Sequence, residues 1–290
     1  MHVFVTGATG YIGTAVTEAL QAVGHSVTGL ARSEEAAHKL EARGTGVERG
    51  DVRQPATVAA AARRADAVIH TALPNTPDAG QVDRGVVETL LDALAGTGKP
   101  FVFTSGVWVH GSTGDRVADE DTPLAPTPLV AWRPAVERFV REAAARGVRG
   151  SVIRPAMVYG RGGGIVAGFI ASARERGATR VVGDGRNRWP WVNVNDLADL
   201  YARLLDASPG TVVLASDGPS IPVREVAAAA SRHAGAGGKV EFWPLEEARR
   251  SLGAYADALV LDQQVSSRRA RETLGWKPAA PPVLAELGAA

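Results

Sequence analysis

Three glycines near the start of the chain are spaced three residues apart. Gly7, Gly10 and Gly13 follow the short apolar run 2–6 and precede an Ala-rich amphipathic stretch that continues to Val23. This order predicts a strand, a tight turn and a helix. The first glycine permits backbone angles that other residues avoid, the second lets the main chain approach a pyrophosphate, and the third lets helix and strand pack closely. The pattern favours a dinucleotide site at the helix N-terminus, with a glycine turn that holds no ligand as the alternative.

The two residues after the second expected strand indicate which dinucleotide the site would bind. Ser26 to Ala31 is expected to form this strand, and Arg32 and Ser33 follow it. An NAD-binding fold of this kind normally places an acidic residue there, against the ribose 2′-hydroxyl. A guanidinium instead suits a 2′-phosphate, and the serine hydroxyl could bind the same oxygens. The pair predicts NADP(H) in preference to NAD(H), with an ordinary surface arginine as the alternative.

The composition favours small-molecule ligands. The 290 residues carry 32 basic and 31 acidic side chains, a net charge of +1 that gives no case for nucleic acid or an anionic membrane. The chain has no cysteine, which excludes disulfides and thiol catalysis, and its acidic residues and histidines lack the spacing of metal ligands. The first strand leaves no room for a signal peptide, and no apolar run reaches the ~18 residues of a membrane span, so we expect a cytoplasmic protein.

Apolar runs alternate with helical patterns through the first half of the chain. Strands are expected at 47–49, 67–71 and 101–104, and helices at 57–64 and 82–95. Parallel strands need crossover connections, so this alternation predicts a doubly wound parallel sheet with helices on both faces. Ligands of such sheets bind outside the carboxyl ends of the strands.

Two pairs of residues at strand ends could therefore contact the cofactor. Asp51 and Val52 follow the third strand, where the carboxylate could accept a hydrogen bond from an adenine amino group; a plain turn aspartate is the alternative. Ala72 and Leu73 end the fourth strand at the ligand-binding edge.

The next segment is expected to complete the sheet. A helix over 129–146 and a strand over 149–154, ending at Pro155, would give six strands in the first 155 residues. A helix over 194–206, capped by Asn193 or Asn195, and a strand over 211–214 could then rejoin the sheet.

The remaining residues are expected to form a smaller unit. The segment 160–191 has the Gly-rich and aromatic character of a lid, and the Pro-Ala ending should trail along the surface. The sequence thus predicts an α/β fold with a Rossmann domain over 1–160, rejoined by about 191–216. A small C-terminal α/β substrate or lid domain is expected over 161–190 and 217–290.

Six short segments agree in order and spacing with one known family. They are 6–13 (TGATGYIG), 51–52 (DV), 104–106 (TSG), 120–123 (EDTP), 154–160 (RPAMVYG) and 191–198 (WVNVNDLA). Through them nearly the whole chain resembles the extended short-chain dehydrogenases/reductases, which include NAD-dependent epimerases and dehydratases. The resemblance implies a Rossmann domain, a small substrate domain, a small-molecule substrate and a homodimer formed through the helices expected at 82–95 and 129–146.

The same resemblance implies a catalytic site in which this chain departs from the pattern. In that family a tyrosine transfers the proton, a lysine four residues later holds the nicotinamide ribose, and a serine after the fifth strand orients the substrate oxygen. Ser105 matches the serine. The Pro-rich loop ends at Pro128 and Glu137 matches a glutamate that commonly follows the lysine by four, which puts Leu129 and Arg133 at the tyrosine and lysine positions. No tyrosine of the chain precedes a lysine by four residues.

Other groups would have to replace the missing pair. Arg133 could hold ribose hydroxyls or polarise a substrate oxygen, but it is a poor general acid. Tyr159 resembles a family position near the nicotinamide, and His110 titrates in a useful range, so either could donate a proton; structural roles are the alternative for both. Three tryptophans could line an apolar pocket or pack the helix and lid, namely Trp132, Trp189 and Trp191.

The residues expected to hold the cofactor are Gly7, Gly10, Tyr11, Ile12, Gly13, Arg32, Ser33, Asp51, Val52, Ala72, Leu73, Arg133 and Pro155. Those expected in catalysis are Ser105, Arg133, Tyr159 and His110. Three functions fit this set: an NADP(H)-dependent oxidoreductase on a small apolar or aromatic carbonyl or hydroxyl compound, a redox-neutral lyase, isomerase or cyclase, and a non-catalytic NADP-binding sensor. Sugar-nucleotide epimerisation is disfavoured because it needs the tyrosine.

Overall fold

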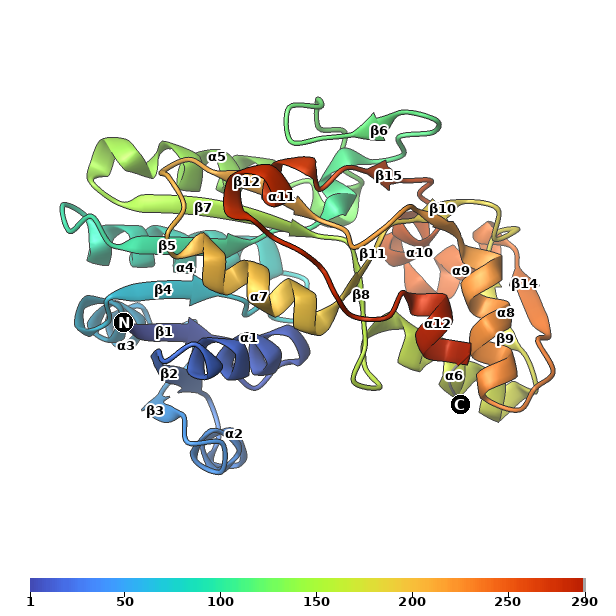
Figure 1. Ribbon diagram of the computed structural model, residues 1–290, viewed down its shortest axis with the longest axis horizontal. Helices are drawn as coiled ribbons and strands as arrows, with labels where there is room; N and C mark the ends of the chain where they lie inside the picture. The colour runs from blue at the N-terminus through green and yellow to red at the C-terminus, as the bar shows by residue number, and fades with distance from the viewer. Residues whose placement is uncertain (289–290) are drawn as a thin grey trace.

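Seven parallel strands form one sheet in the computed structural model, which describes residues 1–288 (Figure 1). Six of the strands lie within the first 155 residues, and chain order along the sheet reverses between β1 and β4. The prediction of an α/β fold with a parallel sheet is confirmed. Across the sheet the strands are β3 (Gly46–Arg49), β2 (Ser26–Ala31), β1 (His2–Thr6), β4 (Ala67–His70), β5 (Pro100–Thr104), β7 (Arg149–Pro155) and β12 (Val212–Ala215).

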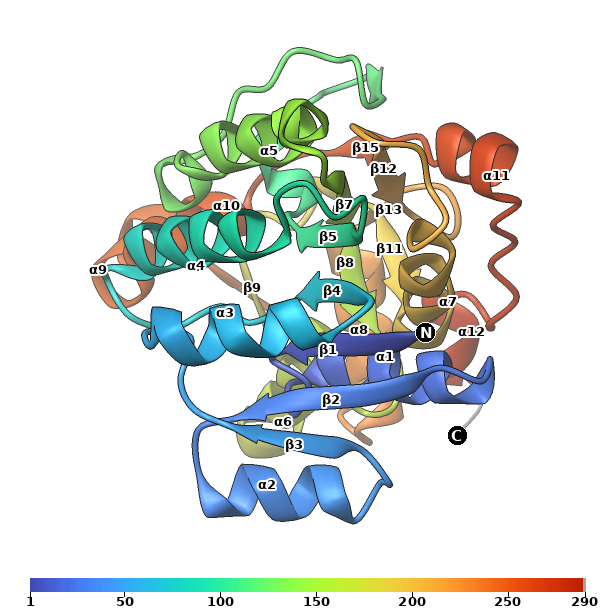
Figure 2. The same ribbon diagram turned by 90° about the vertical axis from the view of Figure 1, so that its left-hand side faces the viewer.

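Helices cover both faces of this sheet (Figure 2). Side chains of a strand alternate between faces, so Val3 and Val5 join one apolar cluster while Phe4 joins the other. The first cluster includes side chains of α1 (Tyr11–Ala22), α2 (Glu34–Glu41) and α7 (Val194–Leu204). The second includes side chains of α3 (Pro55–Arg64), α4 (Ala79–Leu94) and α5 (Arg133–Arg141).

The helix expected over 129–146 is interrupted. A short 3₁₀ turn occupies Pro128–Val130, α5 begins only at Arg133, and a second 3₁₀ turn follows at Glu142–Arg146. Pro134 explains the late start, because a proline inside a helix clashes with the carbonyl four residues earlier but is tolerated in the first turn. Leu129 and Arg133 therefore lie on two separate elements.

Short strand pairs extend the molecule beyond the carboxyl ends of the sheet. We call this region the smaller lobe; its own cluster contains Tyr159, Phe169, Trp189, Trp191 and Val226. The paired strands are β8 (Met157–Tyr159) with β11 (Trp191–Asn193), β9 (Thr179–Val182) with β14 (Val240–Trp243), and β10 (Arg188–Trp189) with β13 (Ile221–Pro222). The helices are α6 (Gly164–Arg176), α8 (Val223–His233), α9 (Leu245–Leu252) and α10 (Ala254–Leu259).

The chain returns from the smaller lobe to the sheet and then leaves it again. Strand β12 pairs with β7, as expected, and Asn193 caps α7 by accepting a hydrogen bond from the Asn195 amide at 2.9 Å. Strand β15 (Gln264–Val265) later pairs with β6 (Val117–Ala118) and leads into α11 (Arg268–Leu274).

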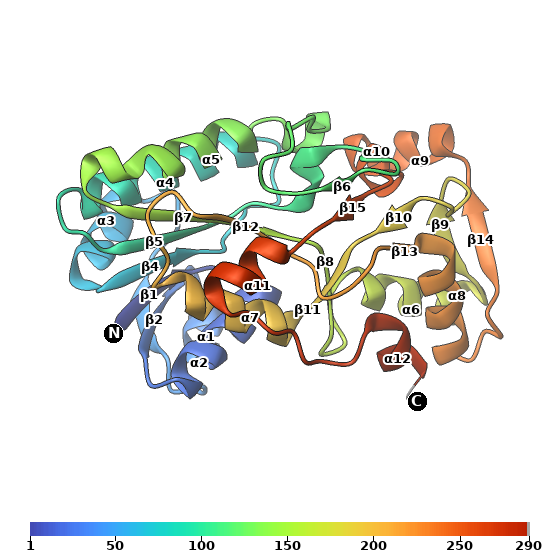
Figure 3. The ribbon, with the colours of Figure 1, turned by 45° about the horizontal axis from the view of Figure 1, so that its top comes forward.

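The Pro-Ala stretch 278–282 is exposed or half-buried, as expected for a segment that runs along the surface, but it is followed by a helix that was not predicted from the sequence. This helix, α12 (Val283–Gly288), lies beside α8, with Val283 and Leu287 buried in the cluster of the smaller lobe (Figure 3). The Trp276 indole donates to the Asp196 carbonyl at 2.8 Å, and the Asp196 carboxylate accepts from the Ala279 amide. Val283 and Leu287 are four residues apart and therefore lie on the same face of α12, the face that packs against the smaller lobe.

None of the helices within residues 1–288 has both the length and the apolar character that a bilayer span requires.

Candidate functional site

The glycine turn has the geometry of an anion cradle. Gly7 has φ of +74°, and a Cβ at Gly13 would lie 2.1 Å from the Gly7 carbonyl oxygen, so helix α1 and strand β1 approach too closely for any side chain. Gly10 is the N-cap of α1 and offers no side chain to its amides, and the first turn contains no acidic residue. The N–H groups at this helix start are thus available to an anion, which fits a dinucleotide pyrophosphate.

Tyr11 and Ile12 follow this turn, and their side chains contact different parts of the molecule. The Tyr11 hydroxyl donates to the Gly160 carbonyl at 2.7 Å, and burial raises the pKa of this phenol. Its ring also packs against Gly163, where a Cβ would lie 2.3 Å away. Tyr11 therefore fixes the loop after β8 over the start of α1, while Ile12 lines the cavity described below.

Arg32 and Ser33 lie together at the start of α2. Ser33 is the N-cap of this helix and accepts a hydrogen bond from the Ala36 amide at 3.2 Å, which leaves its hydroxyl proton free to donate. Arg32 is exposed and forms no ion pair with any residue between 1 and 288. The two acidic residues of the first turn, Glu34 and Glu35, are paired with Arg49 and Lys39.

The other expected cofactor contacts lie along the same edge. The Asp51 carboxylate accepts from the Arg53 amide at 2.8 Å, a turn contact that occupies one of its oxygens. Val52 packs against the core, whereas the backbone of Ala72 lies so close to Gly7 that a Cβ at Gly7 would be 2.7 Å from the Ala72 nitrogen. Leu73 is half exposed at the rim of the cavity.

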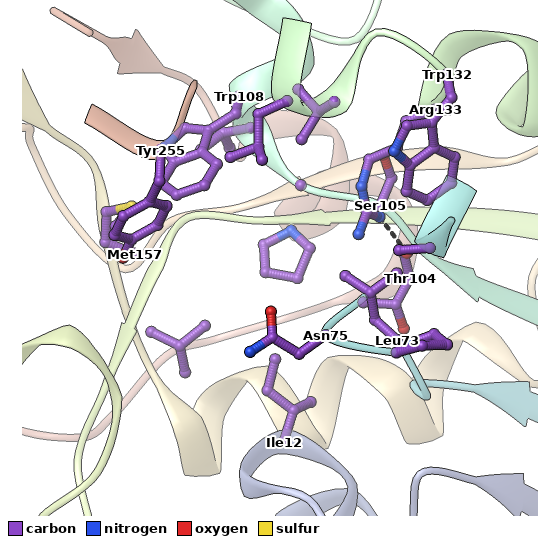
Figure 4. A pocket seen from close by; sticks show the side chains of 18 of the residues that line it. Ile12, Leu73, Asn75, Thr104, Ser105, Trp108, Trp132, Arg133, Met157 and Tyr255 are labelled. Carbon is purple, nitrogen blue, oxygen red and sulfur yellow. Dashed lines mark hydrogen bonds between the residues drawn. The ribbon is translucent and has the colours of Figure 1, made fainter. Parts of the chain in front are cut away.

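A cavity of about 460 Å³ opens at the carboxyl ends of the strands, beside the glycine turn (Figure 4). Most of its lining is apolar, and it draws on both the sheet and the smaller lobe. The lining residues are Ile12, Leu73, Pro74, Asn75, Thr76, Ala79, Thr104, Ser105, Gly106, Val107, Trp108, Leu129, Val130, Trp132, Arg133, Pro155, Ala156, Met157, Val158 and Tyr255.

Ser105, Leu129 and Arg133 meet at this cavity. Arg133 is 9 % exposed; its Nη1 donates to the Thr104 carbonyl at 2.7 Å, and its guanidinium carbon lies 4.6 Å from the centre of the Trp132 ring. Burial lowers the pKa of this guanidinium. The Ser105 hydroxyl is buried and has no hydrogen-bond partner within residues 1–288. Such an unpartnered hydroxyl fits a site that binds a polar atom of a ligand.

His110 and Tyr159 do not line the cavity. Arg154 Nη1 lies 3.2 Å from His110 Nε2, and burial followed by the nearby Arg154 charge lowers the pKa of this histidine to about 4. The Tyr159 hydroxyl donates to Asp217 at 2.6 Å, lies 2.9 Å from the Pro281 carbonyl, and has its pKa raised by burial. Both side chains are thus engaged in contacts within the fold.

The three tryptophans separate into two groups. Trp132 lines the cavity, whereas Trp189 and Trp191 are buried against each other in the smaller lobe, with ring centres 5.8 Å apart.

Sequence reasoning missed several residues of the cavity. Tyr255, on α10, packs its ring edge-to-face against Trp108, with centres 5.8 Å apart and an interplanar angle of 65°. Asn75 and Met157 complete the wall (Figure 4). Tyr255 and Asn75 lie outside the six segments that carry the family resemblance, so only the three-dimensional fold brings them to the cavity. Met157 belongs to the segment 154–160, but its place in that segment does not show that its side chain lines a cavity.

No group of three or more histidine, aspartate or glutamate side chains in the described part of the chain is placed to hold a metal ion.

Comparison with known proteins agrees with this geometry. The model of the NAD dependent epimerase/dehydratase family matches residues 3–215. An uncharacterized protein of Schizosaccharomyces pombe is 33% identical, with 96% of this chain and 95% of that protein covered. The 3-diazoavenalumate denitrifying reductase of a Streptomyces species is 29% identical, with 97% of each chain covered.

A solved structure shows the same fold. The UDP-glucose 4-epimerase of Thermus thermophilus in complex with NAD superimposes with a TM-score of 0.81 at 23% identity, covering 98% of this chain and 96% of that one. The matched family model spans most of the sequence, including the glycine turn and the strands of the sheet. The chain belongs to the NAD dependent epimerase/dehydratase family.

Proposed function

We propose that the protein is an NADP(H)-dependent oxidoreductase that acts on a small apolar or aromatic carbonyl or hydroxyl compound without a tyrosine acid/base. One observation carries the proposal: Ser105, a buried Arg133 and Leu129, the residue expected at the tyrosine position, all line one apolar cavity next to the glycine turn. The reductase among the similar proteins and the NAD-bound epimerase fold support a nicotinamide cofactor. In this proposal residues 161–190 and 217–290 form the substrate unit.

The residues around the glycine turn would hold the cofactor. The amides at the start of α1 would bind the pyrophosphate, Arg32 and Ser33 the 2′-phosphate, and Arg133 the nicotinamide ribose. The chemistry that NADPH supplies when bound is hydride donation to a carbonyl carbon.

The chain itself would orient and polarise the substrate. The Ser105 hydroxyl has no partner in the fold and can donate a hydrogen bond to a substrate oxygen. The Arg133 charge would stabilise negative charge that develops on that oxygen. Leu129 has no exchangeable proton. His110 lies against Arg154, and the Tyr159 hydroxyl donates its hydrogen bond to Asp217. Water would therefore protonate the oxygen. A hydride on carbon and a proton on oxygen convert a carbonyl to an alcohol.

The test measures binding and turnover separately. Calorimetric titration of the purified protein with NADP⁺ and NAD⁺ should show tighter binding of NADP⁺. NADPH consumption should then be followed with a panel of aromatic aldehydes and ketones, for the native protein and for Ser105→Ala and Arg133→Gln. We expect each substitution to slow consumption at least tenfold. Cofactor binding with product formation but no NADPH consumption would instead favour the redox-neutral lyase or isomerase.

A further inference from the structure

The lining of the cavity contains a positive charge and no negative charge. Arg133 is the only charged side chain among the residues that line it, and no aspartate or glutamate belongs to that lining. The side chain is nine-tenths buried, so water screens its charge poorly. A cation in this setting is costly unless an anion faces it.

Two buried carboxylates, Asp83 and Glu137, favour the Arg133 charge through space, but neither forms an ion pair with its guanidinium. Asp83 Oδ1 lies 3.0 Å from His70 Nε2, and Glu137 forms a buried ion pair with Arg154 at 2.6 Å. Within residues 1–288 no carboxylate lies within ion-pair distance of the Arg133 guanidinium. Its one hydrogen bond, to the Thr104 carbonyl, uses one of five N–H donors.

Two further polar groups of the lining are buried, unpartnered and able to donate a hydrogen bond. The Ser105 hydroxyl and the Trp108 indole N–H are buried and have no hydrogen-bond partner in the described chain. The indole N–H can only donate and the hydroxyl can donate, so a ligand with acceptor atoms, such as the oxygens of a carboxylate, would satisfy both groups.

Aromatic rings shape the space between these donors. Trp108 and Tyr255 form one wall, and Trp132 lies beneath the Arg133 guanidinium on the opposite wall (Figure 4). Aromatic side chains offer large apolar contact areas and pair favourably with other rings. With the contacts proposed above, the cofactor would not neutralise Arg133, because ribose hydroxyls carry no charge and the pyrophosphate would be held by the glycine turn.

From these contacts we propose that the substrate is a flat apolar acid whose carboxylate is bound by Arg133. Two N–H donors of the planar guanidinium fit the two oxygens of a carboxylate, and the aromatic walls enclose the apolar body. In this more specific form of the proposal Arg133 positions the substrate, and the Ser105 hydroxyl is the group that polarises the reacting oxygen. This inference deepens the proposed function and rests on it, since the carboxylate would lie in the cavity that adjoins the nicotinamide.

The experiment compares acids with their neutral amides. Benzoate, trans-cinnamate and cyclohexanecarboxylate are titrated calorimetrically into the full-length protein saturated with NADP⁺, each beside the matching amide. We expect benzoate or trans-cinnamate to bind at least tenfold more tightly than its amide, and cyclohexanecarboxylate, whose ring is not planar, to bind more weakly than the planar acids. Arg133→Gln should reduce this preference to less than threefold, whereas Arg133→Lys, which keeps the charge, should retain most of it. Arg138→Gln, an exposed arginine on the same helix, is the matched control and should keep the native preference.

Two results would overturn the inference. One is that no acid binds more tightly than its amide to the native protein, a comparison that needs no variant. The other is a tenfold preference that persists in Arg133→Gln. If NADP⁺ itself does not bind, the proposed function fails, and the same titrations without cofactor still decide whether the cavity selects carboxylates.

Discussion

Gly13 and Gly10 differ in how much space surrounds their Cα hydrogens. A Cβ at Gly13 would lie 2.1 Å from the Gly7 carbonyl oxygen, whereas one at Gly10 would lie 3.2 Å from the same atom. Gly13→Ala is expected to force the backbone apart, lowering the free energy of unfolding by about 1–3 kcal/mol and abolishing NADP⁺ binding. Gly10→Ala should weaken binding more than stability. Chemical denaturation and calorimetry measure the two effects.

Gly85, on helix α4, provides the control for these substitutions. A Cβ at this position would meet no atom within 4 Å, and alanine favours a helix interior by roughly 0.5–1 kcal/mol over glycine. Gly85→Ala should therefore stabilise the protein slightly and leave NADP⁺ affinity unchanged. Native stability and affinity in Gly13→Ala would contradict the close approach of α1 to the glycine turn.

Arg32 provides the test of cofactor choice. A lost charge-assisted contact costs roughly 1.5–3 kcal/mol, so Arg32→Ala should weaken NADP⁺ binding about ten- to hundredfold and change NAD⁺ binding little. Arg63→Ala removes another exposed arginine, at the end of α3, and should change neither affinity. Equal losses for both dinucleotides, or tighter binding of NAD⁺ by the native protein, would remove Arg32 from this role.

Residues of the site were predictable where they belong to a motif. The glycines, Ser105, Leu129 and Arg133 could be located because spacing and neighbouring motifs fix their register. Tyr255 could not, since it reaches the cavity only through the path of a distant helix. The hydrogen bonds of Tyr159 with Asp217 and Pro281 were equally hidden, because they join positions far apart in sequence.

Helix α5 is joined to strand β7 by a buried ion pair. Arg154 contacts both oxygens of Glu137, and each side chain is 2 % exposed. Glu137→Leu would leave the Arg154 charge buried without a counterion, so the free energy of unfolding should fall by about 3–5 kcal/mol. The double change Glu137→Leu with Arg154→Met should recover much of that loss.

The exposed pair Arg84 and Glu88 on helix α4 is the comparison for this prediction. Surface pairs contribute only about 0–1 kcal/mol, so Glu88→Ala should change the free energy of unfolding by no more than that. Similar denaturation curves for Glu137→Leu and Glu88→Ala would show that the buried pair contributes no more than a surface contact.

Elements were predictable where a local pattern determines them. The alternating strands and helices of the sheet follow from hydrophobic periodicity, which depends on neighbouring residues alone. The late start of α5 depends on the geometry of Pro134, and α10 and α12 are too short to give a periodic signal. Their helical state depends on packing against distant parts of the chain, such as α8 for α12.

His110 is expected to make the free energy of unfolding of the whole molecule depend on pH. Burial, then repulsion by Arg154, lowers the pKa of this histidine from 6.5 to about 4. Between these values the unfolded chain binds a proton that the folded protein excludes, so this stability is present above pH 6.5 and lost as the pH falls to 4. The contribution is about 3 kcal/mol. Denaturation of native protein and His110→Asn across this range should give a difference of that size in pH dependence.

An exposed histidine on α2, His38, provides the control. His38→Asn reports the effect of losing any histidine, and its stability should follow the native pH dependence closely. The same slope in native protein and His110→Asn would exclude His110 as the source of acid sensitivity.

Strand β12 closes the sheet beside β7, although the chain passes through the smaller lobe between the two strands. A chain that leaves the ribosome N-terminus first must hold β7 as an open edge until residues 212–215 emerge. Open edges invite pairing with other chains. A recombinant fragment that stops at Gly160 also lacks α7, which covers one face of the sheet, and is expected to aggregate. We therefore expect that residues 1–160, although they contain the glycine turn, do not fold as an independent unit.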